Sequence, residues 1–250
     1  MLISISPDAA ALMRDAAQRV LSLSRAAIVE RGVFHIALSG GSTPSAMFRL
    51  MASPEYALQF DWAAIHLWWS DERYAPLDSP ELNYNMANDA LIRRVPIPLA
   101  NVHRTPVELP AAEAADAYEA EIARVLGGPR TPGGPLPAFD VILLGLGEDG
   151  HTASCFPGTL GALPSDRLTA AHYVPQVKMQ RITFTPRLLN AARHVIFLVS
   201  GAGKAAVLQR VLHGPCQPDV LPAQIVAPHP GDLIWMIDEA AASGLSARRS

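Results

Sequence analysis

The sequence predicts an α/β protein with a mostly parallel sheet and helices on both faces. Three segments are almost entirely apolar, as strands covered on both faces are: residues 139–146, 194–199 and 233–237. Segments with apolar residues at helical spacing lie between the predicted strands, which favours parallel crossover connections over hairpins. Ligands bind such sheets beyond the carboxyl ends of the strands, and the unusual residues of this chain fall at those ends.

The elements follow in order along what we expect to be one domain, residues 1–250. A helix is predicted over residues 7–30, with Ser6 as its N-cap and Pro7 at its first position. A strand at residues 33–38, a glycine turn and a helix at residues 45–51 come next. A second strand is predicted at residues 65–69, and the remaining predicted helices are residues 83–94 and 111–126. Residues 127–137 contain four Gly and four Pro and are predicted to form a surface loop.

Composition excludes several classes of protein. Half of the 250 residues are apolar and 17% are charged, as in ordinary globular proteins. The net charge of −3 and the lack of basic clusters, apart from Arg248 and Arg249, argue against nucleic-acid binding. No apolar run is long enough to span a membrane, and no secretory leader is apparent, so we expect a cytoplasmic protein. Two cysteines, Cys155 and Cys216, are too few for a disulfide framework and are expected to be buried.

A glycine-rich segment, SGGSTP at residues 39–44, follows the first predicted strand. Gly40 and Gly41 have no Cβ and let backbone N–H groups turn toward an anion, while the hydroxyls of Ser42 and Thr43 add donors. The helix that follows would add its positive end. A tight turn without a ligand is the alternative. The Gly-Lys-Ser/Thr of a nucleotide P-loop is missing, so the segment predicts a phosphate site without indicating a nucleotide.

A second glycine-rich segment, LGLGEDGHTAS at residues 144–154, follows another predicted strand. Three glycines within six residues indicate a strained loop that a ligand approaches closely. A histidine side chain titrates near neutrality, and Asp149 is close enough in sequence to orient the His151 ring or stabilise its cation. We therefore predict His151 as an acid/base group. A metal site is the weaker alternative, because Asp-Gly-His lacks further ligands at a recognised spacing.

Cations occur near two further strand ends. Arg73 belongs to WSDERY, residues 69–74, although acidic residues beside an arginine can also form a surface ion pair. Arg181 begins RITFT, and Lys204 ends GAGK after the strand at residues 194–199. A lysine at a helix start is opposed by the helix dipole, which indicates a partner anion. Arg73, Arg181 and Lys204 are therefore predicted to surround the phosphate together with the glycine loop.

Four blocks in this order resemble the 6-phosphogluconolactonase family: SGGSTP, WSDERYAPLDSPELNYNMA, LLGLGEDGHTASCFPG and RITFTPRLLNAARHVIFLVSGAGK. The resemblance extends to the last predicted strand. It implies a Rossmann-like fold shared with glucosamine-6-phosphate deaminases. It also implies hydrolysis of 6-phospho-D-glucono-1,5-lactone to 6-phosphogluconate in the oxidative pentose phosphate pathway, with no metal or organic cofactor.

Residue by residue, the resemblance implies that His151 is the catalytic histidine and Asp149 its aspartate. It implies phosphate contacts from the glycine loop and the basic side chains, namely Gly40, Gly41, Ser42, Thr43, Arg73, Arg181 and Lys204. The expected partner is a small sugar-phosphate lactone, with no nucleic acid and no membrane. The oligomeric state stays open between a monomer and a weak dimer.

The sequence leaves three alternatives to this assignment. The deaminase branch shares the glycine loop and Asp-Gly-His, but its loop continues into a further acidic residue, whereas residues 152–157 here contain none. A Ser154 nucleophile would replace direct attack by water, although no Gly-x-Ser-x-Gly segment is present. A non-catalytic sugar-phosphate sensor would have the phosphate loop without the histidine or its aspartate. Backbone N–H groups of residues 145–150 and Arg73 are both candidates to stabilise an oxyanion.

Overall fold

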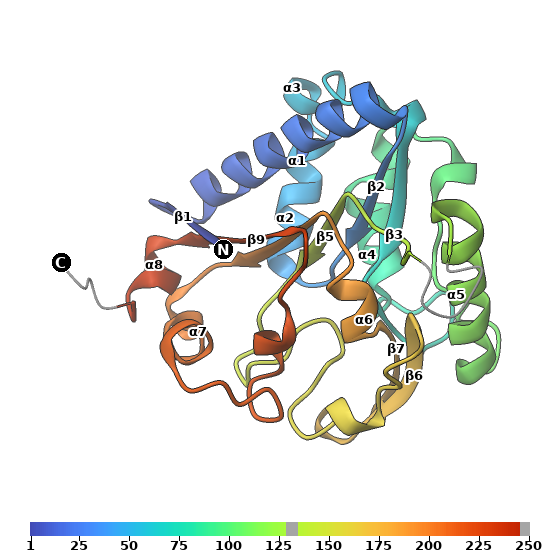
Figure 1. The fold of residues 1–250 in the computed structure, drawn as a ribbon. Coiled ribbons are helices and arrows are strands. Elements are labelled where there is room, and N and C mark those ends of the chain that lie inside the picture. Colours follow the sequence, from blue (N-terminus) through green and yellow to red (C-terminus); the bar gives the residue numbers. More distant parts are fainter. Residues whose placement is uncertain (129–134, 246–250) are drawn as a thin grey trace.

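A six-stranded parallel sheet forms the centre of the computed structural model, which describes residues 1–128 and 135–245 (Figure 1). The strand order is β1-β9-β8-β5-β2-β3, and every neighbouring pair is parallel. The predicted fold class is therefore confirmed. The strands are β1 (Leu2–Ser6), β2 (Phe34–Leu38), β3 (Ile65–Trp69), β5 (Val141–Leu144), β8 (His194–Val199) and β9 (Asp232–Asp238).

A smaller antiparallel sheet has the order β4-β7-β6. Its strands are β4 (Asp71–Arg73), β6 (Thr169–Val174) and β7 (Met179–Phe184). None of the three was predicted from the sequence, and neither was β1. β4 is only three residues long, and the other strands of this sheet mix polar with apolar residues, so they lack the continuous apolar pattern of the central strands.

Helices cover both faces of the central sheet (Figure 1). α1, α2 and α4 contribute to one buried cluster, and α5, α6, α7 and α8 contribute to the other. The helices are α1 (Ala9–Arg31), α2 (Ser42–Met51), α3 (Pro54–Ala57), α4 (Asn83–Ala90), α5 (Ala111–Leu126), α6 (Pro186–Leu189), α7 (Ala205–His213) and α8 (Glu239–Ala242).

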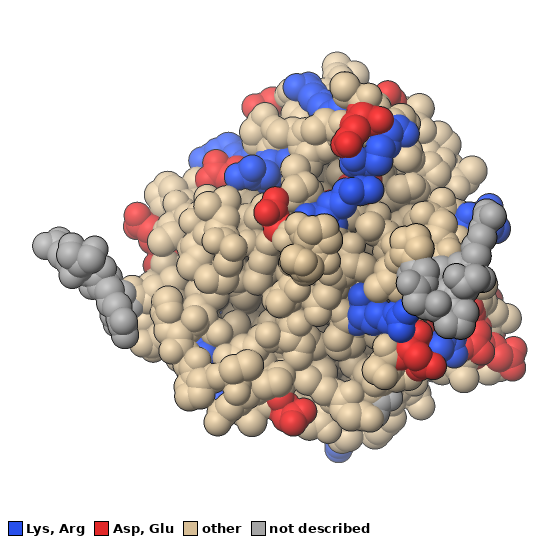
Figure 2. Space-filling model, viewed as in Figure 1, with Lys and Arg blue, Asp and Glu red and all other residues tan. Residues whose placement is uncertain are grey.

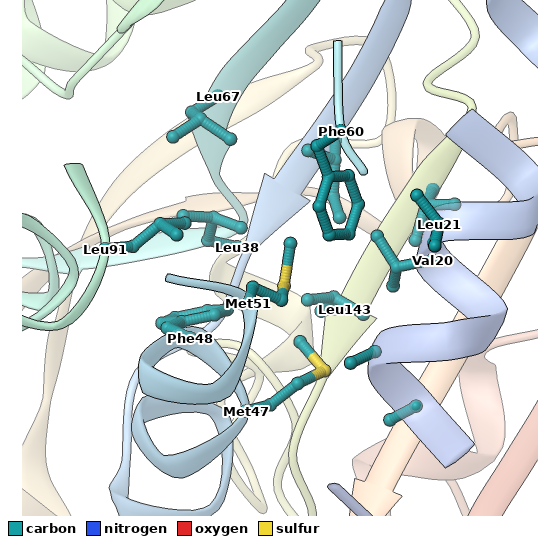
Figure 3. Close-up of a cluster of buried hydrophobic side chains, with 14 of the residues drawn as sticks. Val20, Leu21, Leu38, Met47, Phe48, Met51, Phe60, Leu67, Leu91 and Leu143 are labelled. Atoms are coloured by element: carbon teal, nitrogen blue, oxygen red, sulfur yellow. The ribbon is translucent and has the colours of Figure 1, made fainter. Parts of the chain in front are cut away.

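The strands supply alternate residues to the two cores because successive side chains of a strand point to opposite faces. In β8, Ile196 and Leu198 join the first cluster, whereas Phe197 and Val199 join the second. Figure 3 shows side chains of the first cluster from α1, α2 and the strands facing one another. Both faces are thus apolar, which is why the predicted strands are continuous apolar runs.

Several predicted boundaries were wrong. The N-cap of α1 is Asp8, whose Oδ1 accepts a hydrogen bond from the Ala11 N–H at 2.7 Å. Ser6 instead ends β1, and its hydroxyl donates to Asp15. The helix after the glycine turn begins at Ser42, and the predicted helix at residues 83–94 ends at residue 90, followed by a short 3₁₀ turn.

Other expectations met mixed outcomes. Cys155 is buried as predicted, but Cys216 is exposed. Most of the predicted loop at residues 127–137, and the basic pair at residues 248–249, lie outside the described residues. On the face that Figure 2 shows, basic side chains lie scattered among acidic ones. Within residues 1–128 and 135–245, no helix is long and apolar enough to cross a membrane.

The strand order places a crevice between β2 and β5. From β2 the chain passes to β3 on one side, whereas from β5 it passes to β8 and β9 on the other. The loops that leave the carboxyl ends of β2 and β5 therefore diverge and open a crevice between them. Both glycine-rich segments predicted to bind substrate follow these two strands, so the topology brings them together.

Three histidines, His35 on β2, His66 on β3 and His103, lie close together on one face of the sheet. His66 Nδ1 lies 2.9 Å from His103 Nε2, and His103 Nδ1 lies 3.0 Å from a Glu121 carboxylate oxygen. The third, His35, accepts a hydrogen bond from the Trp68 indole, and Trp68 stacks on His103 with ring centroids 3.9 Å apart. Burial, together with the neighbouring His66, His103 and Arg31, lowers the pKa of His35 to about 3.

Because His35 is buried in its neutral form, we expect the folded protein to lose stability in acid. The pKa of His35 is lower in the folded protein than in the unfolded chain. The contribution of neutral His35 to the free energy of unfolding is therefore complete above about pH 6.5 and is lost as pH falls. Between pH 7 and pH 5 the expected loss is about 2 kcal/mol from His35 alone. Urea unfolding at pH 7 and at pH 5 should show a smaller difference in the free energy of unfolding for His35→Gln than for wild type. The exposed His213→Gln variant is the control, and an unchanged difference in His35→Gln would contradict the prediction.

Candidate active site

Loops from four strands meet at the carboxyl edge of the central sheet and enclose a cavity of about 240 Å³. They follow β2, β3, β5 and β8. The cavity is lined by six of the nine residues predicted from the sequence to form a site: Gly40, Gly41, Arg73, His151, Arg181 and Lys204. Ser42 and Thr43 line a smaller adjoining cavity that shares Gly40, Gly41 and Lys204 with the first. The fold therefore brings predicted residues from distant parts of the chain to one place.

His151 and Asp149 form a close pair in the loop after β5. His151 Nδ1 lies 2.6 Å from Asp149 Oδ1, and the His151 backbone N–H donates to the same oxygen at 3.1 Å. An ionised carboxylate only accepts hydrogen bonds, so Nδ1 carries a proton, and in the neutral ring Nε2 keeps a free lone pair. Partial burial acts to raise the pKa of Asp149, but these hydrogen bonds and the ring charge lower it overall. The pair suits a neutral imidazole that accepts a proton at Nε2.

Two further contacts hold the His151 ring in place, and neither was predicted. Phe156, which is buried, stacks on the imidazole with ring centroids 4.0 Å apart and an interplanar angle of 17°. The backbone of Gly147 lies so close that a Cβ there would meet His151 Nδ1 at 2.0 Å and Asp149 Oδ1 at 2.6 Å. The ring is therefore fixed by a carboxylate, an aromatic face and a glycine backbone.

The loop after β2 ends at the N-terminus of α2. Gly41 has φ +105°, in the region that favours glycine, and precedes the first helical residue, Ser42. A Cβ on Gly40 would lie 1.9 Å from Asn83 Oδ1, so the first glycine of the pair permits a close approach rather than a turn. The first backbone N–H groups of a helix have no partner within it, and here they border a cavity with Lys204. The N–H groups at the start of α2 and the Lys204 ammonium together form a site suited to binding an anion.

Two arginines face the cavity from the small sheet. Arg73 on β4 and Arg181 on β7 are directly opposite each other in the antiparallel register. Like charges in such positions repel, and in the part of the chain that the structure describes both Nε atoms are buried without a hydrogen-bond partner. Burial lowers the pKa of Arg181, and Arg73 lowers it further, whereas the Asp71 carboxylate raises it. An anionic ligand would relieve the repulsion and supply the missing acceptors.

The acidic residues beside Arg73 do not form a surface ion pair, since both are buried. Glu72 points away from the cavity, where its carboxylate accepts backbone hydrogen bonds at 2.7–2.8 Å from Arg73, Asn83 and Tyr84. Burial outweighs the lowering effect of these hydrogen bonds and raises the pKa of Glu72 to about 7. The carboxylate thereby caps the first turn of α4 and holds Asn83 against the cavity.

The serine alternative has no support in the geometry. Ser154 is fully buried, and its hydroxyl donates to Asp71 Oδ2 at 2.7 Å, so its proton points to a carboxylate and not to His151. Its backbone N–H is also held, by Thr183 Oγ1 at 3.2 Å. Among the residues the structure describes, no three His, Cys, Asp or Glu side chains are grouped so as to hold a metal ion.

Fold and cavity together define an enzyme of the open α/β class, with a His–Asp pair and several cations at the carboxyl edge of a parallel sheet. A family model described as glucosamine-6-phosphate isomerases/6-phosphogluconolactonase matches residues 7–235. The chain therefore belongs to this family.

Named relatives span nearly the whole chain. A 6-phosphogluconolactonase of Synechocystis is 42% identical over 221 residues, with 88% of each chain covered. One from Nostoc is 38% identical over 246 residues, with 98% of each covered. A solved structure of 6-phosphogluconolactonase from Trypanosoma cruzi superposes with a TM-score of 0.86 at 32% identity, covering 98% of this chain and 97% of that one.

Proposed function

We propose that this chain hydrolyses 6-phospho-D-glucono-1,5-lactone to 6-phosphogluconate, a step of the oxidative pentose phosphate pathway. The observation that carries the proposal is the His151–Asp149 pair in a cavity that also contains Arg73, Arg181 and Lys204. Such a cavity offers a base at one place and positive charge for a phosphate at another. The names of the chain's relatives give the same reaction.

His151 acts as the general base in this proposal. Its neutral ring accepts a proton at Nε2 from the water that attacks the lactone carbonyl, and Asp149 stabilises the resulting imidazolium. The imidazolium then returns the proton to the ring oxygen as the C1–O bond breaks, which gives the open acid. Holding the phosphate at the far end of the substrate positions C1 beside the histidine, so binding contributes directly to the rate.

The phosphate is assigned to the α2 N-terminus with Ser42 and Thr43, and to Arg181 and Lys204. An oxyanion develops at the lactone carbonyl when water attacks. We favour Arg73 over the backbone N–H groups of the loop after β5 as the group that stabilises it. Two backbone N–H groups of that loop already donate within it: Gly147 to the His151 carbonyl at 2.8 Å and Gly150 to the Gly147 carbonyl at 3.0 Å. A guanidinium that lines the same cavity as the base has the charge to stabilise a developing alkoxide.

The first test is the reaction itself. Purified protein, treated exhaustively with a metal chelator, is expected to accelerate hydrolysis of freshly generated 6-phosphogluconolactone above its spontaneous rate. The same preparation should release no ammonia from glucosamine 6-phosphate, because that reaction requires several acid/base groups to move protons along the carbon chain. Ammonia release at comparable turnover would move the assignment to the deaminase branch, and loss of lactonase activity on chelation would indicate a metal.

Gly147→Ala tests whether ring placement matters. The added methyl group would collide with both members of the His151–Asp149 pair, so kcat is expected to fall about 10–100-fold with little change in KM. The matched control is Gly161→Ala, since nothing lies within 4 Å of a Cβ at that position. Steady-state kinetics with melting temperatures separate displacement from unfolding. A folded Gly147→Ala protein with wild-type kcat would contradict the proposed role of the pair.

A further inference from the structure

The cavity contains hydrogen-bond acceptors that the proposed mechanism does not use. Asp71 and Asn83 line it together with His151 and the cations. Asp71 shares a face of β4 with Arg73, because residues two apart in a strand point the same way. Only 8% of Asp71 is exposed, so its carboxylate belongs to the wall of the cavity and is not a solvated surface group.

Asp71 and Asn83 are both fixed by hydrogen bonds to neighbouring residues, and both still have free acceptor sites. Ser154 Oγ donates to Asp71 Oδ2 at 2.7 Å, and Asn83 Nδ2 donates to the Asp71 backbone carbonyl at 2.9 Å. The remaining contact to Asp71 Oδ1, from Asn83 Nδ2, is long at 3.5 Å. A carboxylate has about four acceptor sites, so Oδ1 has room for a strong donor. Across the described chain, Asn83 Oδ1 is also among the buried atoms without a hydrogen-bond partner.

The charge of Asp71 is unfavourable for phosphate binding alone. A carboxylate beside an anion site repels the anion and weakens the hold of Arg181. Its presence is explained if the ligand also brings donors that must be satisfied. A gluconolactone ring has free hydroxyls at C2, C3 and C4, and arginine and lysine side chains cannot accept hydrogen bonds from them. Asp71 and Asn83 supply acceptors on the cavity wall.

We propose that Asp71 and Asn83 accept hydrogen bonds from ring hydroxyls of the lactone and thereby select a polyhydroxylated ring. The inference rests on the proposed lactonase function and adds a specificity subsite to it. Asn83 links this subsite to the phosphate loop, because its amide oxygen lies against Gly40. Glu72 fixes the backbone of Asn83 through the first turn of α4, so the acceptor is preorganised.

The experiment compares four substrates: 6-phosphogluconolactone and the three analogues that each lack one ring hydroxyl, at C2, C3 or C4. Wild type is expected to lose roughly ten- to hundredfold in kcat/KM on at least one deoxy lactone, since a site built to bind a hydroxyl rejects the analogue without it. Asp71→Asn should lower kcat/KM for the full lactone by a similar factor. For the deoxy lactone on which wild type loses activity, kcat/KM of Asp71→Asn should stay within about threefold of the wild-type value. Ser154→Ala, which only loosens Asp71, should give a smaller loss with the same pattern.

Asp116→Asn, on the exposed surface of α5, is the matched control and should leave all four values unchanged. Equal kcat/KM of wild type for all four lactones overturns the subsite and leaves the lactonase function standing, even if Asp71→Asn does not fold. Equal losses on every lactone in a folded Asp71→Asn protein overturn it as well. Wild type with no acceleration on any lactone overturns the proposed function and the subsite together.

Discussion

Replacing His151 by alanine is expected to lower kcat by about 10²–10⁴, with folding and product binding close to wild type. The ring is the base that the geometry places in the cavity, and it is oriented by Asp149 at 2.6 Å and by the Phe156 face. Removing it leaves the phosphate contacts untouched. Single-turnover kinetics, binding of 6-phosphogluconate and the melting temperature measure the three quantities separately.

The pH dependence provides a second readout for the same residue. The rate should rise with pH as the imidazole loses its proton, because only the neutral ring accepts one. Asp149→Asn should move this limb toward lower pH, since removing a nearby negative charge disfavours the imidazolium. It should also reduce the rate, because the carboxylate fixes the protonated Nδ1 and so leaves Nε2 as the acceptor.

His213→Ala, at the end of α7, is the matched control and should keep the wild-type rate and profile. A folded His151→Ala protein with near-wild-type kcat would end the proposed mechanism. The base would then have to be Asp149 or Glu148, the other proton acceptors of that loop. If activity merely follows the folded fraction, His151 serves the fold and not the chemistry.

Arg181→Ala is expected to raise KM for the phosphorylated lactone by about ten- to 150-fold, equivalent to losing roughly 1.5–3 kcal/mol of a charge-assisted contact. Arg181 is buried, faces Arg73 across the small sheet and lines the cavity shared with Lys204. Unphosphorylated gluconolactone should be a poor substrate of wild type and almost indifferent to the change. Lys204→Ala should act in the same direction. Steady-state kinetics on both lactones provide the measurement.

Arg93→Ala removes an exposed arginine whose partner is Asp89 and is the control for a change of charge alone. Equal effects of Arg181→Ala on the phosphorylated and unphosphorylated lactones would contradict phosphate binding. Arg181 would then act on the lactone end of the substrate or on the packing of β7. A melting temperature close to wild type in Arg181→Ala excludes the second of these.

Local interactions could be predicted from the sequence. His151 and Asp149 are two residues apart in one tight loop, so their hydrogen bond depends on few backbone angles. The glycine loop and the start of α2 are adjacent in the chain as well. The central strands are covered on both faces, so each is a continuous apolar run whatever its neighbours are. These features establish the fold class and the resemblance to the family.

Only the tertiary structure decided which other side chains share the cavity. Arg73 and Arg181 face each other through the pairing of two short strands far apart in the sequence. Asp71, Asn83 and Phe156 carried no signal of their own, because an acidic residue, an amide and an aromatic are ordinary in a loop, a helix start and a core. What makes them part of the site is the antiparallel register and the burial of Glu72 under α4. Those depend on the summed packing of segments distant in the chain, for which no local pattern of residues is diagnostic.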